Sequence, residues 1–359
     1  MLKERIRVGV LMGGKSGERE VSLASGCHLV RTLDPTKYEV YPIELGMDGK
    51  WYLHHIDSPL LSEPRTIGTE PPTADTYEPP TANDSELVTG RVMKSRIDVL
   101  FLALHGPGGE DGAIQGYLET LGIPYVGSGI LASALTMDKG RCKTFIQASG
   151  LPTPNWILLR KNQWEKETEK FRQRALADFP DGMVVKPNNL GSSIGISVLS
   201  AGENPFDAIE RAFLVDSEVL IEARIQGKEL TCGVYGQENP EVLPVTEIRP
   251  KNEFFDYESK YQAGASEEIT PAEISDELAR EVQSLARNAH LAFGCRGITR
   301  TDFMVVDEKP SIIEVNTIPG MTSVSIIPRA CEAAGLDFEV ILDRVIGEAL
   351  FREELIPVA

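Results

Sequence analysis

Four side chains toward the C-terminal end of the chain, Arg300, Asp302, Glu314 and Asn316, are of types that can handle phosphate. Two carboxylates and one amide oxygen make an all-oxygen ligand set of the kind that holds Mg²⁺. A guanidinium beside such a site can stabilise the negative charge that develops during phosphoryl transfer. The residue types therefore predict a metal site formed by Asp302, Glu314 and Asn316, with Arg300 next to it.

Two predicted strands would bring these side chains together. The apolar runs 303–306 and 312–315 predict strands, and D-E-K-P at 307–310 predicts the turn between them. Residues two apart on a strand point to the same face, so Glu314 and Asn316 should face Asp302. A solvated surface hairpin is the alternative. It suits the turn, but Glu314 lies among apolar residues, where a carboxylate needs a partner.

A second group of residues also suggests a phosphate ligand. Lys186 lies inside M-V-V-K-P at 183–187, a predicted strand, and a buried ammonium needs an anion. The glycine- and serine-rich loop 188–196 follows, and such loops can direct backbone amides at phosphate. The alternative is an ordinary hairpin turn with Lys186 at its exposed start.

Residues 9–16 match the P-loop pattern G-x-x-x-x-G-K-[ST] in their letters. However, the apolar run 7–12 predicts a strand, which would place Gly9 within it instead of in a phosphate-binding loop. We therefore expect Lys15 and Ser16 not to cradle phosphate. A P-loop NTPase that uses these two residues stays open as an alternative function.

Composition bounds the class of protein. The 359 residues leave room for two or three domains, and the net charge of −18 argues against nucleic acid or an anionic membrane as a partner. No window reads as a transmembrane helix, and the first apolar run is too short for a signal peptide. The five cysteines are scattered, which is typical of reduced thiols in a cytoplasmic protein.

The N-terminal region has the alternation of an α/β domain. The strand at 7–12, the Gly13-Gly14 turn and a helix at 20–33 are the opening of a doubly wound fold, which binds ligands at its strand ends. Residues 46–95 are expected to be an irregular surface insertion. Further predicted strands are 38–45, 97–104 and 219–225, and further predicted helices are 114–121, 128–148, 203–214, 273–292 and 338–351.

Six segments, in order, closely resemble the motifs of D-alanine–D-alanine ligases, members of the ATP-grasp superfamily. They are GGKSGEREVS, ALHGPGGEDG, MDK, VKPNNLGSSIG, FFDYESKY, and RTD followed by IIEVNTIPGMTSVS. The resemblance implies a mixed α/β fold of three domains. These are an N-terminal doubly wound α/β domain (1–127), a central ATP-grasp subdomain (128–222), and a C-terminal ATP-grasp domain (223–359) with the lid loop and metal site.

The resemblance also implies the activity and the partners. Two D-alanines would be joined to D-alanyl-D-alanine through an acylphosphate, for peptidoglycan precursor synthesis, with consumption of ATP and with two Mg²⁺ or Mn²⁺ ions per site. A homodimer is implied as well. Residues 262–270 depart from the commoner wording of the family's lid loop. The preference for D-alanine over D-lactate or D-serine as second substrate therefore stays open.

The roles implied for individual residues follow the motifs. The catalytic set is Glu18, Ser192, Tyr261, Arg300 and Gly320, the other substrate-binding residues are His105, Lys260 and Ser325, and the ATP-binding set is Lys139, Lys186, Ser193, Glu222, Ile225, Glu229 and Phe254.

Several of these residues have a plainer interpretation. Glu18 could be an acidic residue near a helix start, His105 a structural histidine, Lys139 a solvated lysine and Glu222 part of an exposed linker. At the level of the whole protein, a D-alanine–D-lactate ligase and a non-catalytic nucleotide-binding sensor stay open beside the main hypothesis.

Overall fold

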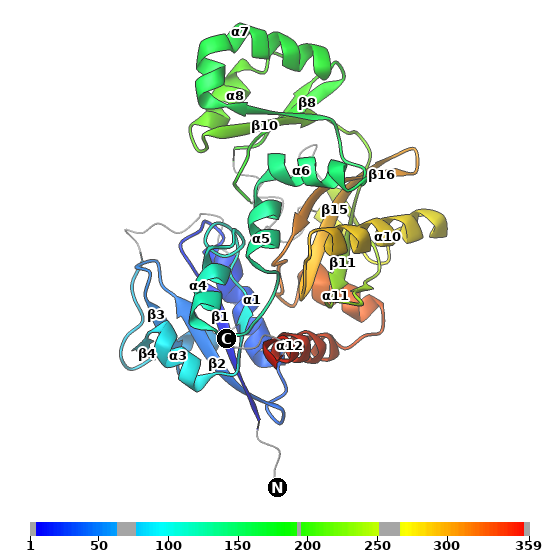
Figure 1. The fold of residues 1–359 in the computed structure, drawn as a ribbon. Coiled ribbons are helices and arrows are strands. Elements are labelled where there is room, and N and C mark those ends of the chain that lie inside the picture. The colour runs from blue at the N-terminus through cyan, green and yellow to red at the C-terminus, as the bar shows by residue number, and fades with distance from the viewer. Residues whose placement is uncertain (1–4, 63–76, 192–194, 251–265, 355–359) are drawn as a thin grey trace.

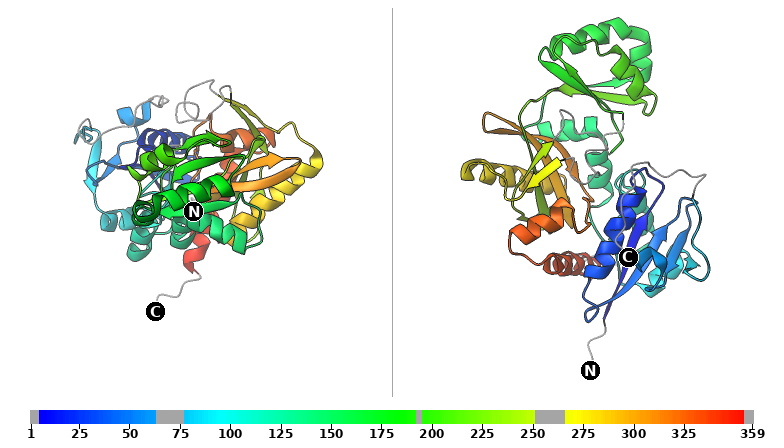
Figure 2. Two further views of the ribbon diagram at one scale, coloured as in Figure 1. Left: turned by 90° about the horizontal axis from the view of Figure 1, so that it is seen from above. Right: turned by 180° about the vertical axis from the view of Figure 1, so that it is seen from behind.

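The structure is a computed structural model that describes residues 5–62, 77–191, 195–250 and 266–354. The described residues form three sheets, and each is associated with a hydrophobic cluster of its own. Figures 1 and 2 show three lobes, with the central part of the chain forming the lobe farthest from the N-terminus. Among the described residues, no helix combines the length and the apolar character needed to cross a membrane.

The first sheet is the predicted doubly wound α/β domain. Its parallel strands are β1 (Ile6–Gly13), β2 (Tyr38–Leu45), β5 (Val99–Leu102) and β6 (Tyr125–Val126). Helices α1 (Arg19–Thr32) and α4 (Ala113–Leu121) follow β1 and β5. Parallel strands are covered on both faces, which explains their continuous apolar runs. The P-loop pattern fails as expected, because residues 9–13 lie within β1 and Lys15 is exposed.

The prediction that residues 46–95 are irregular is wrong for much of the described part of this segment. Strands β3 (Trp51–His54) and β4 (Ser85–Val88) extend the first sheet at its edge by antiparallel pairing. Helices α2 (Pro59–Ser62) and α3 (Gly90–Arg96) accompany them. These elements are short, so none gives a periodic signal of useful length, and pairing with β2 decides their structure.

The second sheet is antiparallel, in the order β7-β10-β8-β9. Its strands are β7 (Trp156–Arg160), β8 (Gly182–Pro187), β9 (Ser197–Ser200) and β10 (Glu218–Ala223). Helices α7 (Lys161–Asp178) and α8 (Phe206–Phe213) pack on it (Figure 1). The strands at 183–187 and 219–225 and the helix at 203–214 were predicted. β7 and α7 were not predicted. Half of the residues of α7 are charged and only Trp164 and Ala175 are buried, so this helix gives little apolar periodicity.

The third sheet carries the predicted carboxylate hairpin. Its order is β14 (Ser266–Ile269), β13 (Thr246–Pro250), β11 (Lys228–Tyr235), β15 (Ile298–Val306) and β16 (Lys309–Asn316), with β12 (Glu241–Val242) beside β11. Helix α10 (Asp276–Ala292) packs against it. The hairpin is confirmed, with strands longer than their apolar runs.

Helices distant from each sheet in sequence complete the cores. The single helix predicted over 128–148 is two helices, α5 (Ile130–Met137) and α6 (Lys139–Ala148), because Asp138 leaves helical geometry and caps α6. Both contribute to the core of the third sheet. Helices α11 (Ile326–Ala333) and α12 (Phe338–Glu354) contribute instead to the core of the first. The first and third cores are therefore each assembled from segments that lie far apart in the sequence.

Candidate active site

One large cavity, of about 950 Å³, lies where the three sheets meet. It is lined by every predicted site residue that the structure describes: Glu18, His105, Lys139, Lys186, Glu222, Ile225, Glu229, Arg300, Asp302, Glu314, Asn316, Gly320 and Ser325. The remaining predicted residues, Ser192, Ser193, Phe254, Lys260 and Tyr261, lie outside the described residues. Side chains separated by hundreds of positions thus converge on one space.

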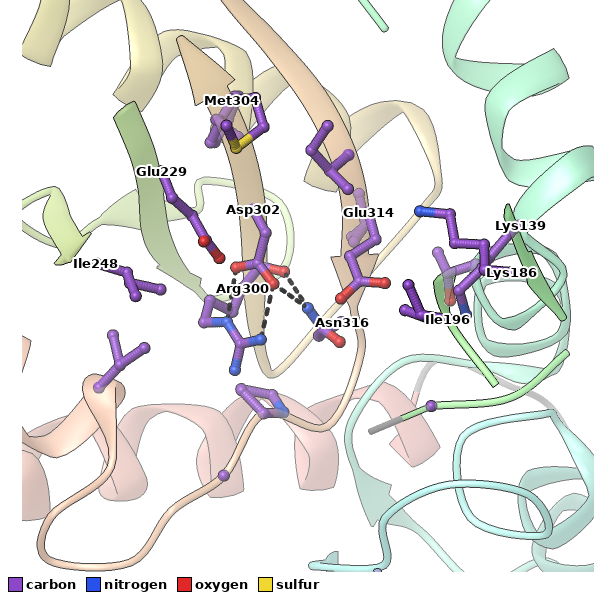
Figure 3. A pocket seen from close by; sticks show the side chains of 18 of the residues that line it. Lys139, Lys186, Ile196, Glu229, Ile248, Arg300, Asp302, Met304, Glu314 and Asn316 are labelled. Atoms are coloured by element: carbon purple, nitrogen blue, oxygen red, sulfur yellow. Dashed lines mark hydrogen bonds and ion pairs between the residues drawn. The ribbon is translucent and has the colours of Figure 1, made fainter. Parts of the chain in front are cut away.

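The carboxylate cluster is built by the pairing of β15 with β16. Asp302 is opposite Glu314, and Arg300 is opposite Asn316. A register irregularity follows Asp302, at the point where the alternation of side chains between faces is interrupted. The convergence that the sequence predicted is therefore present, and Figure 3 shows Asp302, Glu314 and Asn316 together on this sheet.

Asp302 is surrounded by donors. The guanidinium of Arg300 donates from Nε to Oδ1 at 2.8 Å and from Nη2 to Oδ2 at 2.8 Å. The Thr231 hydroxyl donates to Oδ1 at 2.6 Å, and the Asn316 amide donates to Oδ2 at 3.0 Å. Charge-assisted, two-point bonds of this kind fix a carboxylate strongly. The group faces the cavity with its orientation set from three strands.

The oxygen atoms at this site can form a three-ligand set for a hard cation only if the Asn316 amide oxygen takes part. Among the described residues, no cluster of three or more His, Cys, Asp or Glu side chains is arranged to hold a metal. Asp302 and Glu314 supply carboxylates and Asn316 supplies the third oxygen, which is the set expected from the sequence. Oxygen ligands of this type suit Mg²⁺.

A buried ion-pair cluster lies across the cavity, and it corrects the reading of Glu222 as part of an exposed linker. Only 3% of Glu222 is exposed. Its carboxylate pairs with Lys186 and, at 2.7 Å, with Lys143. Burial alone would raise the pKa of Glu222, but the two ammonium groups lower it to about 2. Burial lowers the pKa of Lys143 against the opposing effect of Glu222.

Lys143 is a residue that sequence reasoning missed. It lies four residues after Lys139 on α6, and its ammonium also donates to the Thr153 hydroxyl at 3.0 Å. Two lysines four apart share one face of a helix, and this spacing was the available signal. It did not stand out because such pairs on helices are usually solvated.

Lys139 itself bridges to the glycine-rich loop. Its ammonium donates to the Leu190 carbonyl at 2.6 Å, and the next amide, that of Gly140, donates to the Asn188 side chain at 2.8 Å. A Cβ at Gly191 would lie 2.9 Å from Oε2 of Glu18. The described start of the loop thus connects Lys139 to the Glu18 end of the cavity.

Glu18 and His105 mark that end. Gly13 and Gly14 have φ values of +92° and +94°, a geometry that favours glycine, and they turn the chain from β1 toward Glu18. The Ser16 hydroxyl donates to the His105 carbonyl at 2.6 Å, which joins the loops after β1 and β5. His105 is buried, and burial lowers its pKa, which favours the neutral imidazole. A carboxylate beside such a ring is suited to an ammonium group.

The remaining predicted residues lie at the opposite edges of the cavity. Ile225 lies just beyond β10, and Glu229 on β11 points inward beside Met304 and Ile248 (Figure 3). At the other edge, Ser325 is the residue before α11, and its hydroxyl accepts a bond from the Thr322 amide at 3.0 Å. The cavity thus has an apolar and acidic side, a phosphate-compatible middle and a helix N-terminus.

The chain matches models of known protein families over most of its length. Residues 7–128 match the family described as D-ala D-ala ligase N-terminus, and residues 145–347 match D-ala D-ala ligase C-terminus. A D-alanine--D-alanine ligase of Leptospira biflexa is 36% identical over 340 residues, covering 93% of this chain and 96% of the relative.

Two solved structures are similar over nearly their full lengths. The VanG D-Ala:D-Ser ligase from Enterococcus faecalis has a TM-score of 0.82 at 32% identity and covers 96% of this chain and 100% of its own. The D-alanine--D-alanine ligase from Bacillus anthracis complexed with ATP has a TM-score of 0.71 at 33% identity and covers 98% and 99%. By sequence and by structure, the chain belongs to the D-alanine–D-alanine ligase family.

Proposed function

We propose that this chain joins two D-alanines to D-alanyl-D-alanine at the expense of ATP, and so supplies a peptidoglycan precursor. The observation that supports this most is the single cavity. It combines a carboxylate cluster with an adjacent guanidinium, a lysine-rich middle and a second carboxylate at the far end. A non-catalytic nucleotide sensor would not need Arg300 beside the cluster.

ATP would lie between the second and third sheets. Lys139 and Lys186 would neutralise its phosphates, while Glu222, Ile225 and Glu229 would bind adenine and ribose. Lys186 now pairs with Glu222 inside a cluster of two lysines and one carboxylate. This cluster has one positive charge in excess, so it favours an anion beside it.

Mg²⁺ would be held by Asp302, Glu314 and Asn316, two ions to a site by family resemblance. The pairing of Asp302 with the Arg300 guanidinium supports this proposal, because the carboxylate already has a cation as its partner. When bound, Mg²⁺ would offset the repulsion between the triphosphate and an incoming carboxylate.

The reaction divides into two displacements. The carboxylate of the first D-alanine, with its ammonium near Glu18, attacks the γ-phosphorus of ATP, and the bond to ADP breaks. The amine of the second D-alanine, after losing a proton, then attacks the acylphosphate carbonyl. The tetrahedral oxyanion would lie near Arg300 and the Gly320 amide, and its collapse releases phosphate. Preorganised donors at such a position typically contribute roughly 3–4 kcal/mol each.

The second substrate would be held by its carboxylate. Ser325 and the N-terminus of α11 present hydrogen-bond donors at that edge of the cavity, where a negative charge is stabilised. By resemblance, Lys260 would assist, Ser192 and Tyr261 would take part in closure over the site, and Ser193 and Phe254 would contact ATP. We also propose that the enzyme acts as a homodimer in the cytoplasm, where its five buried free thiols stay reduced.

The function is tested by measuring ADP release with Mg-ATP and identifying products by mass. D-alanine alone is compared with D-alanine plus D-lactate, D-alanine plus D-serine, and L-alanine. We expect D-alanyl-D-alanine from D-alanine alone, and its loss in Glu314→Gln. Glu308→Gln, in the exposed turn of the same hairpin, is the matched control. A mixed product formed in preference to D-alanyl-D-alanine would show that the second substrate is D-lactate or D-serine. ADP release without any ligated product would refute the substrate assignment.

A further inference from the structure

The loop that carries Gly320 is held from outside its own domain. Pro319 and Gly320 stand between Ile318 and Met321, and the N-terminal domain bonds to the backbone of both flanking residues. The Ile318 carbonyl accepts from His105 Nδ1 at 2.9 Å, and the Ile318 amide donates to Glu110 at 3.3 Å. On the other side, the Met321 carbonyl accepts from His28 Nδ1 at 2.7 Å, and the Met321 amide donates to Ser25 Oγ at 3.2 Å.

These contacts join into one directional chain. A carbonyl oxygen only accepts, so His105 must carry its proton on Nδ1 to bond Ile318. In the neutral ring, Nε2 is then an acceptor, and the Ser25 hydroxyl 3.1 Å away donates to it. That hydroxyl in turn accepts from the Met321 amide. The chain therefore runs from the Met321 amide through Ser25 and His105 to the Ile318 carbonyl.

This chain encloses Pro319 and Gly320 without using the Gly320 amide. Ser25 is fully buried and only 5% of His105 is exposed, so the bonds are shielded from water. Proline has no N–H. Among the described residues, no hydrogen bond occupies the Gly320 N–H, and Gly320 lines the cavity. The flanks are fixed while the one amide between them is left for a ligand.

The helix that provides Ser25 also begins at the first substrate position. Glu18 is the residue before α1, and Ser25 follows it by two helical turns, on the same side of the helix. A rigid helix of this length sets a spacing of roughly 10 Å between the two residues. The position of Glu18 and the position of the 318–321 loop are therefore tied to one element.

We propose that Ser25 is a positioning residue for catalysis. Together with His105, it aims the Gly320 amide at the oxyanion of the second displacement, so that the domain binding the first D-alanine also sets the oxyanion site. This inference rests on the proposed function. It predicts a role in the transition state and not in substrate binding, because Ser25 contacts the loop and not a substrate.

The test compares Ser25→Ala with Ser22→Ala. Ser22 is one turn earlier on α1, is equally buried, and makes two bonds of 2.7 Å, one from the Gly13 amide and one to the Ala103 carbonyl, both within the N-terminal domain. We expect Ser25→Ala to lower kcat about tenfold or more, with KM for ATP and D-alanine within about twofold. Ser22→Ala should lose similar thermal stability with a much smaller loss of kcat.

Two further measurements separate positioning from packing. A phosphinate dipeptide analogue, whose tetrahedral oxygen occupies the oxyanion position, should bind Ser25→Ala about tenfold more weakly, while ADP binding is unchanged. Ser25→Cys keeps the side-chain shape but weakens its hydrogen bonds, so its kcat should resemble that of Ser25→Ala.

The inference is overturned if Ser25→Ala keeps its kcat, if Ser22→Ala loses as much, or if the cysteine variant behaves as wild type. If the wild type makes dipeptide in the same experiments, the proposed function stands although this inference fails. If the wild type makes no dipeptide, the proposed function fails and this inference fails with it.

Discussion

Replacing Glu222 by glutamine should destabilise the second sheet by more than the loss of an exposed ion pair would. Glu222 is the carboxylate shared by Lys143 and Lys186, and the exposed fractions of the three side chains are 4%, 1% and 7%. Removing the carboxylate leaves two buried ammonium groups facing one another. Breaking a buried pair in this way typically destabilises a protein by roughly 3–5 kcal/mol.

The pKa gives an independent magnitude. The pKa of Glu222 lies at about 2, against an ordinary value of 4.5. This difference corresponds to about 3 kcal/mol of stability at neutral pH. Because the pKa is lowered on folding, the contribution is present above the unfolded value and is lost as pH falls toward the folded one. The stability gap between wild type and Glu222→Gln should therefore be constant above pH 5 and roughly half as large at pH 3.

Native-state hydrogen exchange of the β8 and β10 amides is the assay, because it reports opening of this sheet without assuming two-state unfolding of the whole chain. Glu218→Gln is the matched control. It lies on the same strand but pairs with Arg141 and Arg160, whose side chains are 48% and 59% exposed. Exposed pairs contribute at most about 1 kcal/mol, so this control should change little.

A double variant tests whether the loss of stability comes from the two unpaired ammonium groups. Lys143→Met removes one buried ammonium, so the double variant with Glu222→Gln should be more stable than Glu222→Gln alone. A Glu222→Gln variant that loses no more stability than Glu218→Gln would refute the argument. So would a double variant less stable than either single one, because the lysines would then stabilise the sheet by packing alone.

Three other outcomes are expected. Arg300→Lys keeps the charge but loses the two-point bond to Asp302, so kcat should fall about tenfold or more with KM for ATP little changed; an unchanged kcat would contradict this. Burial lowers the pKa of His290 from 6.5 to about 4. The unfolded chain therefore takes up a proton first as pH falls, and in urea titrations wild type should lose about 2 kcal/mol relative to His290→Asn between pH 7 and 5. Lys15→Ala should keep kcat within about twofold, whereas a P-loop would lose nearly all activity.

The chemistry of the site was predictable from local sequence. Asp302, Glu314 and Asn316 could be identified in the sequence because they are polar residues next to apolar runs. The two-residue period of a strand then predicts which of them share a face. The glycine turn after β1 and the failure of the P-loop pattern were predictable for the same reason. Each depends on residues that are neighbours in the chain.

Other features depended on contacts between distant segments. The short strands β3 and β4 form because β2 offers an edge, and the helix predicted over 128–148 divides because Asp138 caps α6, whose start is held by Asn188. The alternative interpretation of Glu222 as an exposed linker residue was excluded only by the packing of β10 between β7 and β8, which buries it.

Ser25 and Lys143 show most clearly what could not be predicted from the sequence. In sequence, one is a serine inside a helix and the other a lysine of a kind that water usually solvates. Their roles arise only when α1 meets the 318–321 loop and α6 meets β10. The period of a helix or strand follows from backbone geometry and can be read along the chain. The burial of a charge and the identity of its partner depend on which surfaces exclude water together, and the tertiary structure alone decides that.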